Sequence, residues 1–271
     1  MGLGIFVNTS DGFQDCWIPF LQLFETYAHV LRELPLYLNT ERAEFHWNRG
    51  SVNSTMVWPL DERERPSWSE CLLRGLNSVK DDRILYMQED YFLTRPIRDE
   101  LILEAMHLFE TMPETGVVYI SEHGPRVRAH RPCSSTFEEI LPPADYLINL
   151  QAAIWDKDYL RSVVRAWENA WMFEIFGSAR APRSRRRFFG LTNEARERGE
   201  AVDYIWTGVM KGKWKPECVE LFRDHGITVD FSRRGFYKEM GRVKSRMEVF
   251  QKLFGRPLPA LRSILSLLPG S

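Results

Sequence analysis

The sequence has little cysteine and no pattern typical of a disulfide or zinc framework. Its 271 residues include four cysteines, Cys16, Cys71, Cys133 and Cys218, and none belongs to a Cys-x-x-Cys pair. The six histidines lack the i, i+4 spacing of ligands on a metalloprotease helix. A disulfide scaffold and a zinc module are therefore disfavoured, and we predict unpaired thiols in a reducing cytoplasm.

Long apolar runs and an export signal are also missing. No uninterrupted apolar run reaches the roughly 18 residues that a membrane-spanning helix needs. The first residues, from Met1 to Asn8, contain neither a basic region nor a long apolar stretch, and they resemble the first strand of a domain. We therefore expect a folded, cytoplasmic protein.

An excess of one charge is absent from the chain as a whole. Lys and Arg number 36 against 37 Asp and Glu, a net charge of -1, which disfavours a uniformly basic protein with a nucleic-acid partner. The average conceals two unlike parts. Residues 233–271 hold nine basic and two acidic residues, a net of +7, and residues 1–232 carry -8. We predict one globular domain over 1–232 and a basic C-terminal segment over 233–271.

Apolar runs that alternate with helical patterns predict an α/β fold with a mostly parallel sheet flanked by helices. Strands are expected at 5–8, 34–38, 56–58, 84–87, 116–120 and 146–155. Helices are expected from Trp17 to Leu31, after a capping box formed by Ser67 and Glu70, over 100–112, after an Asp156 cap, and over 170–176 with an end at Gly177.

Two acidic residues at the end of one strand are the most informative local feature. The apolar run 84–87 ends abruptly in Gln88, Glu89 and Asp90. Open α/β sheets bind ligands outside the carboxyl ends of their strands. Carboxylates there could hold Mg²⁺ or Mn²⁺, which take oxygen ligands and bridge to phosphates. The alternative is that the two residues cap the next turn or pair with Arg95 or Arg98.

The run from Ile84 to Leu93 resembles the strand and acidic motif of GT-A-type glycosyltransferases, particularly bacterial enzymes that build lipopolysaccharide and capsular polysaccharides. The stretch 7–11 resembles their nucleoside-binding loop and 36–40 their second strand, while 154–160 and 171–174 resemble acceptor-side segments. The resemblance covers roughly residues 5–237 and implies that 1–232 is a GT-A-like glycosyltransferase domain. The resemblance implies a GT-A-like, Rossmann-type sheet, a nucleotide-sugar donor, and a glycan or lipid-linked saccharide acceptor. The family pattern is Asp-x-Asp, and Gln88 replaces its first acid, so metal dependence stays open.

Donor-binding candidates lie at the ends of two predicted strands. Short polar side chains at the end of the first strand suit a base and ribose, and an ordinary polar turn is the alternative. The donor candidates are Asn8, Thr9, Ser10, Asp11, Gln88 and Glu89, with Asp90 as a catalytic residue and Asp90 and Glu89 as metal ligands. The candidates for binding the diphosphate are Lys211, Lys213 and Arg180. The alternative is that they are ordinary solvated charges on loops.

Glu174 is the candidate base for the acceptor hydroxyl. It lies among aromatic residues, and a carboxyl that such residues bury has a raised pKa. It also falls in the segment where the resemblance implies an acceptor-side acid. A structural pair with Arg180 is the alternative, with Asp156 and Asp203 in reserve. Trp171, Trp206 and Trp214 neighbour these segments and are the acceptor-stacking candidates, whereas Trp17 and Trp167 lie on apolar helical stripes and are expected in the core.

The basic C-terminal segment has an amphipathic pattern. Apolar residues recur at helical spacing in two groups, Met247, Phe250, Leu253 and Phe254, then Leu258, Leu261, Ile264, Leu265 and Leu268. A basic amphipathic helix is typical of a membrane surface rich in anionic lipid. The alternative is that this apolar side packs on the domain.

These observations favour an inverting glycosyltransferase of cell-surface polysaccharide biosynthesis, peripheral to the cytoplasmic membrane. The alternative is a non-catalytic carbohydrate-binding or scaffold protein with the same fold, which the loss of the first acid at Gln88 permits. A nucleotidyltransferase is disfavoured because no early glycine-rich, lysine-containing phosphate loop is present.

Overall fold

A computed structural model describes residues 2–48, 52–125, 128–239 and 242–268. Its centre is a nine-stranded sheet in the order β3-β2-β1-β4-β8-β5-β9-β7-β6. Within the described residues, only β7 and β8 run against the other strands of this sheet. The strands are β1 (Leu3–Asn8), β2 (Leu36–Asn39), β3 (Val52–Ser54), β4 (Arg83–Gln88), β5 (Thr115–Tyr119), β6 (Ala129–Pro132), β7 (Phe137–Leu141), β8 (Ala153–Asp156) and β9 (Arg187–Leu191).

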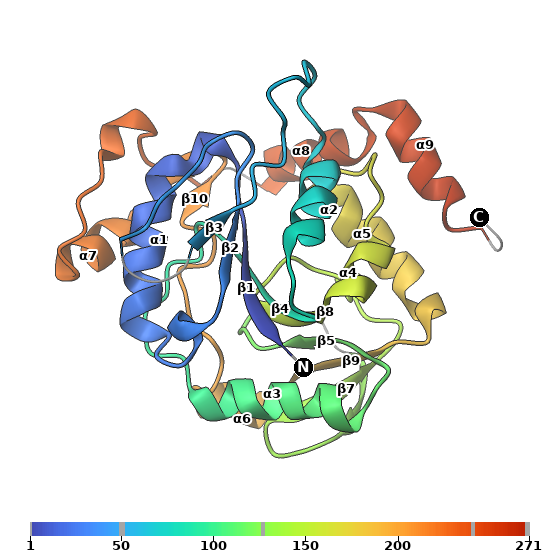
Figure 1. Ribbon diagram of the computed structural model, residues 1–271. Coiled ribbons are helices and arrows are strands. Elements are labelled where there is room, and N and C mark those ends of the chain that lie inside the picture. Colours follow the sequence, from blue (N-terminus) through green and yellow to red (C-terminus); the bar gives the residue numbers. More distant parts are fainter. Residues whose placement is uncertain (1, 49–51, 126–127, 240–241, 269–271) are drawn as a thin grey trace.

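Helices cover both faces of the sheet (Figure 1). The helices are α1 (Gln14–Tyr27), α2 (Trp68–Ser78), α3 (Asp99–Thr111), α4 (Lys157–Val163), α5 (Ala170–Arg180), α6 (Asn193–Glu197), α7 (Glu217–Asp224), α8 (Arg242–Phe254) and α9 (Pro257–Leu265). A short hairpin of β10 (Val209–Met210) and β11 (Lys213–Trp214) lies outside the main sheet.

Alternation along the buried strands divides the core into two layers. In β1, Ile5 and Val7 pack with α1, α3 and α7, whereas Phe6 points to the other face, against α2 and α4. Because successive side chains of a strand point to opposite faces, a strand covered on both sides has an uninterrupted apolar sequence. This explains why β1, β4 and β5 were visible as apolar runs.

Several local predictions are confirmed. Ser67 and Glu70 form the expected capping box of α2, and Asp156 accepts a hydrogen bond from the Tyr159 amide at the start of α4. Others are wrong. The third strand is Val52–Ser54 rather than 56–58, and of 146–155 only the end belongs to β8. Helix α5 continues through Gly177 to Arg180, and a Cβ at Gly177 would lie 3.3 Å from Ile148 Cγ2, so this glycine serves close packing and does not end the helix.

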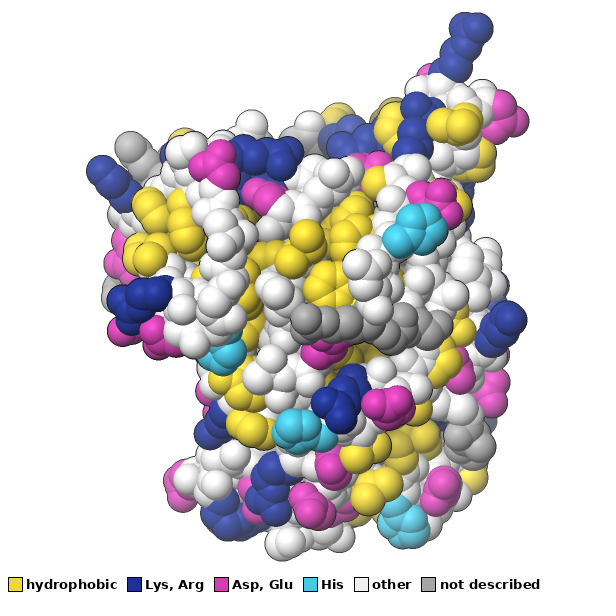
Figure 2. Space-filling view, turned by 60° about the vertical axis from the view of Figure 1, so that its left-hand side comes forward, with side chains coloured by type: hydrophobic (Ala, Val, Ile, Leu, Met, Phe, Trp, Pro, Cys, Tyr) yellow, Lys and Arg dark blue, Asp and Glu magenta, His cyan; other side chains and the backbone are white. Residues whose placement is uncertain are grey.

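No helix within the described ranges combines the length and apolar character that crossing a membrane requires. On the face shown in Figure 2, Lys and Arg side chains are interspersed with Asp and Glu.

Candidate functional site

The acidic residues after β4 lie at the carboxyl edge of the parallel strands. In the sheet register, Asn8 at the end of β1 pairs with Gln88 on one side and with Asn39 of β2 on the other. The structure thus brings together the polar strand ends that the sequence indicated. Glu89 and Asp90 follow immediately, and they are 7% and 3% exposed.

Asp90 is held by the loop that precedes the β10–β11 hairpin. Its Oδ2 accepts a hydrogen bond of 3.1 Å from the Val209 amide, and its carbonyl accepts one of 2.9 Å from the Gly208 amide. A Cβ on Gly208 would lie 2.4 Å from the Phe92 ring, so this approach needs glycine. The other carboxylate oxygen, Oδ1, is buried and accepts no hydrogen bond from the described residues.

Burial raises the pKa of both carboxyls above the usual range, and for Glu89 the neighbouring Asp90 charge adds to this rise. Arg234 acts against the shift at both residues, and Lys215 does so at Asp90. Two adjacent buried carboxylates whose charge is only partly compensated favour the approach of a cation.

Arg234 is a site residue that the sequence analysis missed. Its Nε donates to Asp15 Oδ2 at 2.7 Å and its Nη2 to the Gly12 carbonyl at 2.6 Å. The guanidinium lies over Phe13 at 4.7 Å from the ring centroid. Trp214 also exchanges backbone hydrogen bonds with Gly235 and Tyr237. Residues 234–237, expected to begin the basic segment, therefore pack on the sheet domain, and nothing in the pattern distinguished Arg234 from the other basic residues near it.

The polar residues after β1 mainly fix loops. Asn8 Oδ1 accepts from Asn39 Nδ2 at 2.8 Å, and Thr9 Oγ1 accepts from Trp17 Nε1 at 2.9 Å. The Asp11 carboxylate accepts from the backbone amides of residues 41, 42 and 43. Asp11 therefore joins the loops after β1 and β2. Ser10, which lies between Thr9 and Asp11 in the sequence, is partly exposed.

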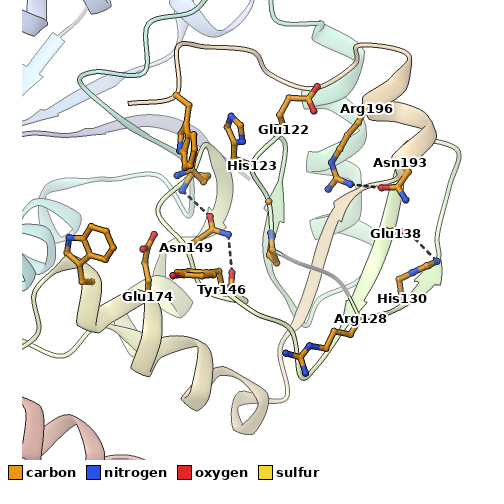
Figure 3. Close-up of a pocket in the computed structure, with 15 residues that line it drawn as sticks. Glu122, His123, Arg128, His130, Glu138, Tyr146, Asn149, Glu174, Asn193 and Arg196 are labelled. Carbon is orange, nitrogen blue, oxygen red and sulfur yellow. Dashed lines mark hydrogen bonds and ion pairs between the residues drawn. The ribbon is translucent and has the colours of Figure 1, made fainter. Parts of the chain in front are cut away.

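A pocket of about 800 Å³ contains the predicted base and two of the three predicted stacking residues. Its lining includes Glu174, Trp171 and Trp206, together with Glu122, His123, Gly124, Pro125, Arg128, His130, Glu138, Tyr146, Asn149, Gln151, Asn193 and Arg196. Figure 3 shows Glu174 projecting from α5 into this pocket, beside Tyr146 and Asn149. Only Trp171, Glu174 and Trp206 were selected from the sequence, because most of the other lining residues come from loops that no periodic pattern marks.

Glu174 is a partly buried carboxyl without a cationic partner among the described contacts. Its Oε1 accepts a hydrogen bond of 2.9 Å from the Leu150 amide, and burial raises its pKa to about 7. The predicted structural pair with Arg180 does not form, because α5 directs the two side chains to different partners. A carboxyl with this pKa exchanges a proton readily near neutral pH.

The pocket borders the acidic residues through Trp206 and the loop that follows it. Trp206 is 49% exposed and stacks on His123, with ring centroids 4.8 Å apart, and Lys215 Nζ lies 5.9 Å from the Trp206 ring centroid. Thr207 links Trp206 to Gly208 and Val209, whose amides bind Asp90. His123 and Lys215 were not selected from the sequence, since a lone histidine in a loop and one lysine among three carry no distinguishing signal.

Two predicted site residues lie in the interior instead. Arg180 donates from Nη1 and Nη2 to the two oxygens of Glu168 at 2.7 Å each, and both side chains are buried. Trp214 is 0% exposed and packs against Phe92 and Phe231. Arg180 thus has its charge satisfied by an ion pair, and Trp214 offers no ring face to a sugar. We correct both assignments to structural ones.

Lys211 and Lys213 flank Gly212 at the exposed turn of the β10–β11 hairpin. The turn places Lys211 and Gly212 at positive φ, 53° and 77°. Both lysines therefore lie on the hairpin whose first strand begins at Val209, and Lys215 follows directly after it.

The residues present fit a divalent cation only together with a ligand that supplies further oxygens. Among the residues that the structure describes, no cluster of three or more His, Cys, Asp or Glu side chains could hold a metal ion. Asp90 nevertheless presents a buried oxygen that has no hydrogen-bond partner in the described part of the chain, next to the Glu89 carboxyl. Mg²⁺ commonly binds through one or two carboxylates, with phosphate oxygens and water completing the octahedron.

No protein-family model and no curated protein matches the sequence. Among solved structures, S. aureus TarS 1-349 aligns with 99% of this chain and 81% of its own, at a TM-score of 0.50 and 11% identity. S. aureus TarS 1-349 in complex with UDP-GlcNAc aligns over 86% of this chain and 69% of its own, also at 0.50 and 11%. Against a longer S. aureus TarS chain, the match covers 44% of that chain, at a TM-score of 0.47 and 10% identity. The predicted GT-A-like α/β fold is confirmed at this level.

Proposed function

We propose that this protein is a glycosyltransferase that moves a sugar from a nucleoside-diphosphate sugar to a saccharide acceptor. The observation that supports this best is the juxtaposition of two sites: a buried carboxylate pair at the carboxyl edge of β4, and a pocket that contains a carboxyl with a pKa of about 7. A chain of the same fold has been solved with UDP-GlcNAc, a nucleotide sugar.

The reaction is a single displacement with inversion. The acceptor hydroxyl oxygen forms a bond to the anomeric carbon, and its proton passes to the Glu174 carboxylate. The bond between that carbon and the diphosphate oxygen breaks, and its electron pair leaves with the nucleoside diphosphate. Burial with a single backbone donor keeps Glu174 basic enough to accept the proton near neutral pH.

Charge on the departing diphosphate is stabilised by residues around the acidic pair. Arg234 and Lys215 are the cations whose fields reach Asp90, and Lys211 and Lys213 lie on the adjoining hairpin. Cations that are already in place where negative charge develops lower the activation barrier of the transfer, because they need not move during the reaction. A divalent cation, Mg²⁺ or Mn²⁺, would be held by Asp90 and Glu89 and would supply further positive charge.

The base and ribose of the donor bind at the loops that Asn8, Thr9, Ser10 and Asp11 build, with Gln88 at the adjacent strand end. The acceptor occupies the pocket, where Trp171 and Trp206 present aromatic faces to sugar rings. We further propose a free or lipid-linked saccharide as acceptor and a role in cell-surface polysaccharide biosynthesis, of the lipopolysaccharide or capsular type, at the cytoplasmic side of the membrane.

The second candidate is a non-catalytic carbohydrate-binding protein. Gln88 replaces the first acid of the family motif. The side chains of Asn8, Thr9 and Asp11 form hydrogen bonds with other residues of the chain, which leaves fewer of their polar groups for a nucleotide. A scaffold would bind a saccharide in the pocket and turn over no donor.

A donor panel separates these two candidates. Hydrolysis or transfer is measured with UDP- and GDP-sugars, with and without Mn²⁺, for the wild type and Asp90→Asn. The transferase predicts turnover of at least one donor and its loss in Asp90→Asn. Saccharide binding without turnover or nucleotide binding would support the scaffold and contradict the transferase.

A further inference from the structure

The two C-terminal helices dock on α5 through one side only. Leu253, Ala260 and Leu267 pack against Met172 and Phe176 of α5. Trp167 Nε1 donates to Ser263 Oγ at 3.1 Å, and Asn169 Nδ2 donates to the Lys252 carbonyl at 2.8 Å. These directional contacts fix which side of α8 and α9 faces the domain, and Figure 1 shows both helices beside α5.

The opposite side is apolar and exposed. It consists of Met247, Phe250, Phe254, Leu258, Leu261 and Leu265, which we call the tail face, and their exposures range from 40% to 71%. Apolar side chains scattered singly over a surface are ordinary, but exposed apolar side chains that recur at helical spacing on two successive helices, α8 and α9, favour an interaction surface.

Charge around the tail face is mostly positive. Residues 247–268, which contain the tail face, hold Lys252, Arg256 and Arg262 and one acidic residue, Glu248. All three cations are exposed. Arg183, from the turn after α5, donates to the Leu267 carbonyl and adds another exposed cation.

We propose that the tail face binds an anionic lipid surface. Apolar side chains that enter the headgroup region, bordered by Lys and Arg that meet lipid phosphates, are the features of an interfacial helix. A second copy of this chain fits less well, because a two-fold contact would bring the same cations of both copies together.

Helix α5 connects the tail to the pocket. Met172 and Phe176 hold the tail on one side of α5, while Trp171 and Glu174 of the same helix line the pocket. Lys252 Nζ lies 4.4 Å from the Trp171 ring centroid, so the tail reaches the pocket rim. Binding through the tail face therefore holds the pocket near the lipid headgroups, where a lipid-linked acceptor would present its saccharide. That acceptor rests on the proposed function, whereas lipid binding does not.

The test is sedimentation of the full chain with phosphatidylcholine vesicles, with and without phosphatidylglycerol. Wild type is expected to bind the anionic vesicles. Leu258→Ser/Leu261→Ser is expected to lose binding by more than about tenfold. Arg256→Gln/Arg262→Gln is expected to lose binding by about 25-fold, at roughly a factor of five for each cation.

Matched controls change equally exposed residues elsewhere. Leu103→Ser on α3, where Leu103 is 67% exposed, and Lys80→Gln, before β4, are expected to bind like the wild type. Failure of the wild type to bind anionic vesicles, or equal binding by the tail-face and control variants, would overturn the proposal. So would a dimer in sedimentation velocity that the tail-face changes dissociate. Donor turnover, assayed without vesicles, reports separately on the proposed function.

Discussion

Two glutamates near α5, one buried and one partly buried, have opposite surroundings. Glu168, just before the helix, is fully buried and forms a two-pronged ion pair with Arg180 at 2.7 Å. Glu174, within the helix, lines the pocket, accepts one backbone hydrogen bond and has no ion pair within the described chain. The first carboxylate has its charge compensated and stabilises the packing of α5. The Glu174 carboxyl has a raised pKa, so its charged form destabilises the fold. A raised pKa is also what a residue needs in order to accept a proton near neutral pH.

Loss of the proposed base gives the largest expected effect. Glu174→Gln keeps the acceptor for the Leu150 amide but removes the proton-accepting group, so kcat should fall by about 10³-fold. In wild type, kcat should decline as pH falls below about 7, because Glu174 becomes protonated there. A steady-state pH profile measures both. An unchanged kcat in Glu174→Gln, or a flat profile through pH 7, would remove Glu174 from the mechanism.

Breaking the ion pair of Glu168 should act on stability instead of chemistry. Arg180→Met leaves an uncompensated buried carboxylate and is expected to cost about 3–5 kcal/mol of unfolding free energy. Glu168→Gln/Arg180→Met should recover much of that loss. Urea unfolding of the single and double variants measures this. If Arg180→Met unfolds like the wild type but loses donor binding, the original assignment of Arg180 to the diphosphate would be restored.

The pH dependence of stability sharpens the same contrast. The folded-state pKa of Glu174 is raised to about 7, so the folded protein binds the proton more tightly than the unfolded chain does. Its carboxyl therefore destabilises the fold increasingly as pH rises from about 4.5 to 7. Glu174→Gln should be more stable than wild type by about 3 kcal/mol at pH 8 and equal to it at pH 4. Urea unfolding at both values tests this, and an equal difference at the two pH values would contradict the raised pKa.

Arg234 extends the comparison to the donor side and has the smallest expected effect. Arg234→Gln should reduce kcat/KM for the donor by about 10–30-fold, because a cation facing the acidic pair is lost. Asp15→Asn is the control: it removes the ion-pair partner and leaves the guanidinium in place. Equal losses in the two variants would show that Arg234 matters only as a support for the loop at Gly12.

The sequence was most informative where burial and function coincide along a short stretch. The apolar run of β4 followed by Glu89 and Asp90 marked the carboxyl edge of the parallel strands, and the aromatic neighbours of Glu174 indicated a carboxyl with a raised pKa. Both inferences need only local context. Strand β6 is exposed throughout, so no apolar alternation revealed it.

Residues that depend on long-range contacts were not predictable. Arg234 acquires its place by reaching Asp15 and Gly12, more than 200 positions away. Trp214 is enclosed by Phe92 and Phe231, and Arg180 by Glu168. Residue type and local neighbours do not distinguish a tryptophan at a pocket from one in the interior, or a free arginine from a paired one.

Nucleotide-sugar binding to the acidic pair is tested most directly by isothermal titration of UDP- and GDP-sugars, with and without Mn²⁺, into wild type, Asp90→Asn and Glu174→Gln. The account predicts that wild type binds at least one donor, that Asp90→Asn binds it at least about tenfold more weakly, and that Glu174→Gln retains donor affinity while losing turnover. Absence of donor binding by the wild type, or equal affinity in Asp90→Asn, would contradict it.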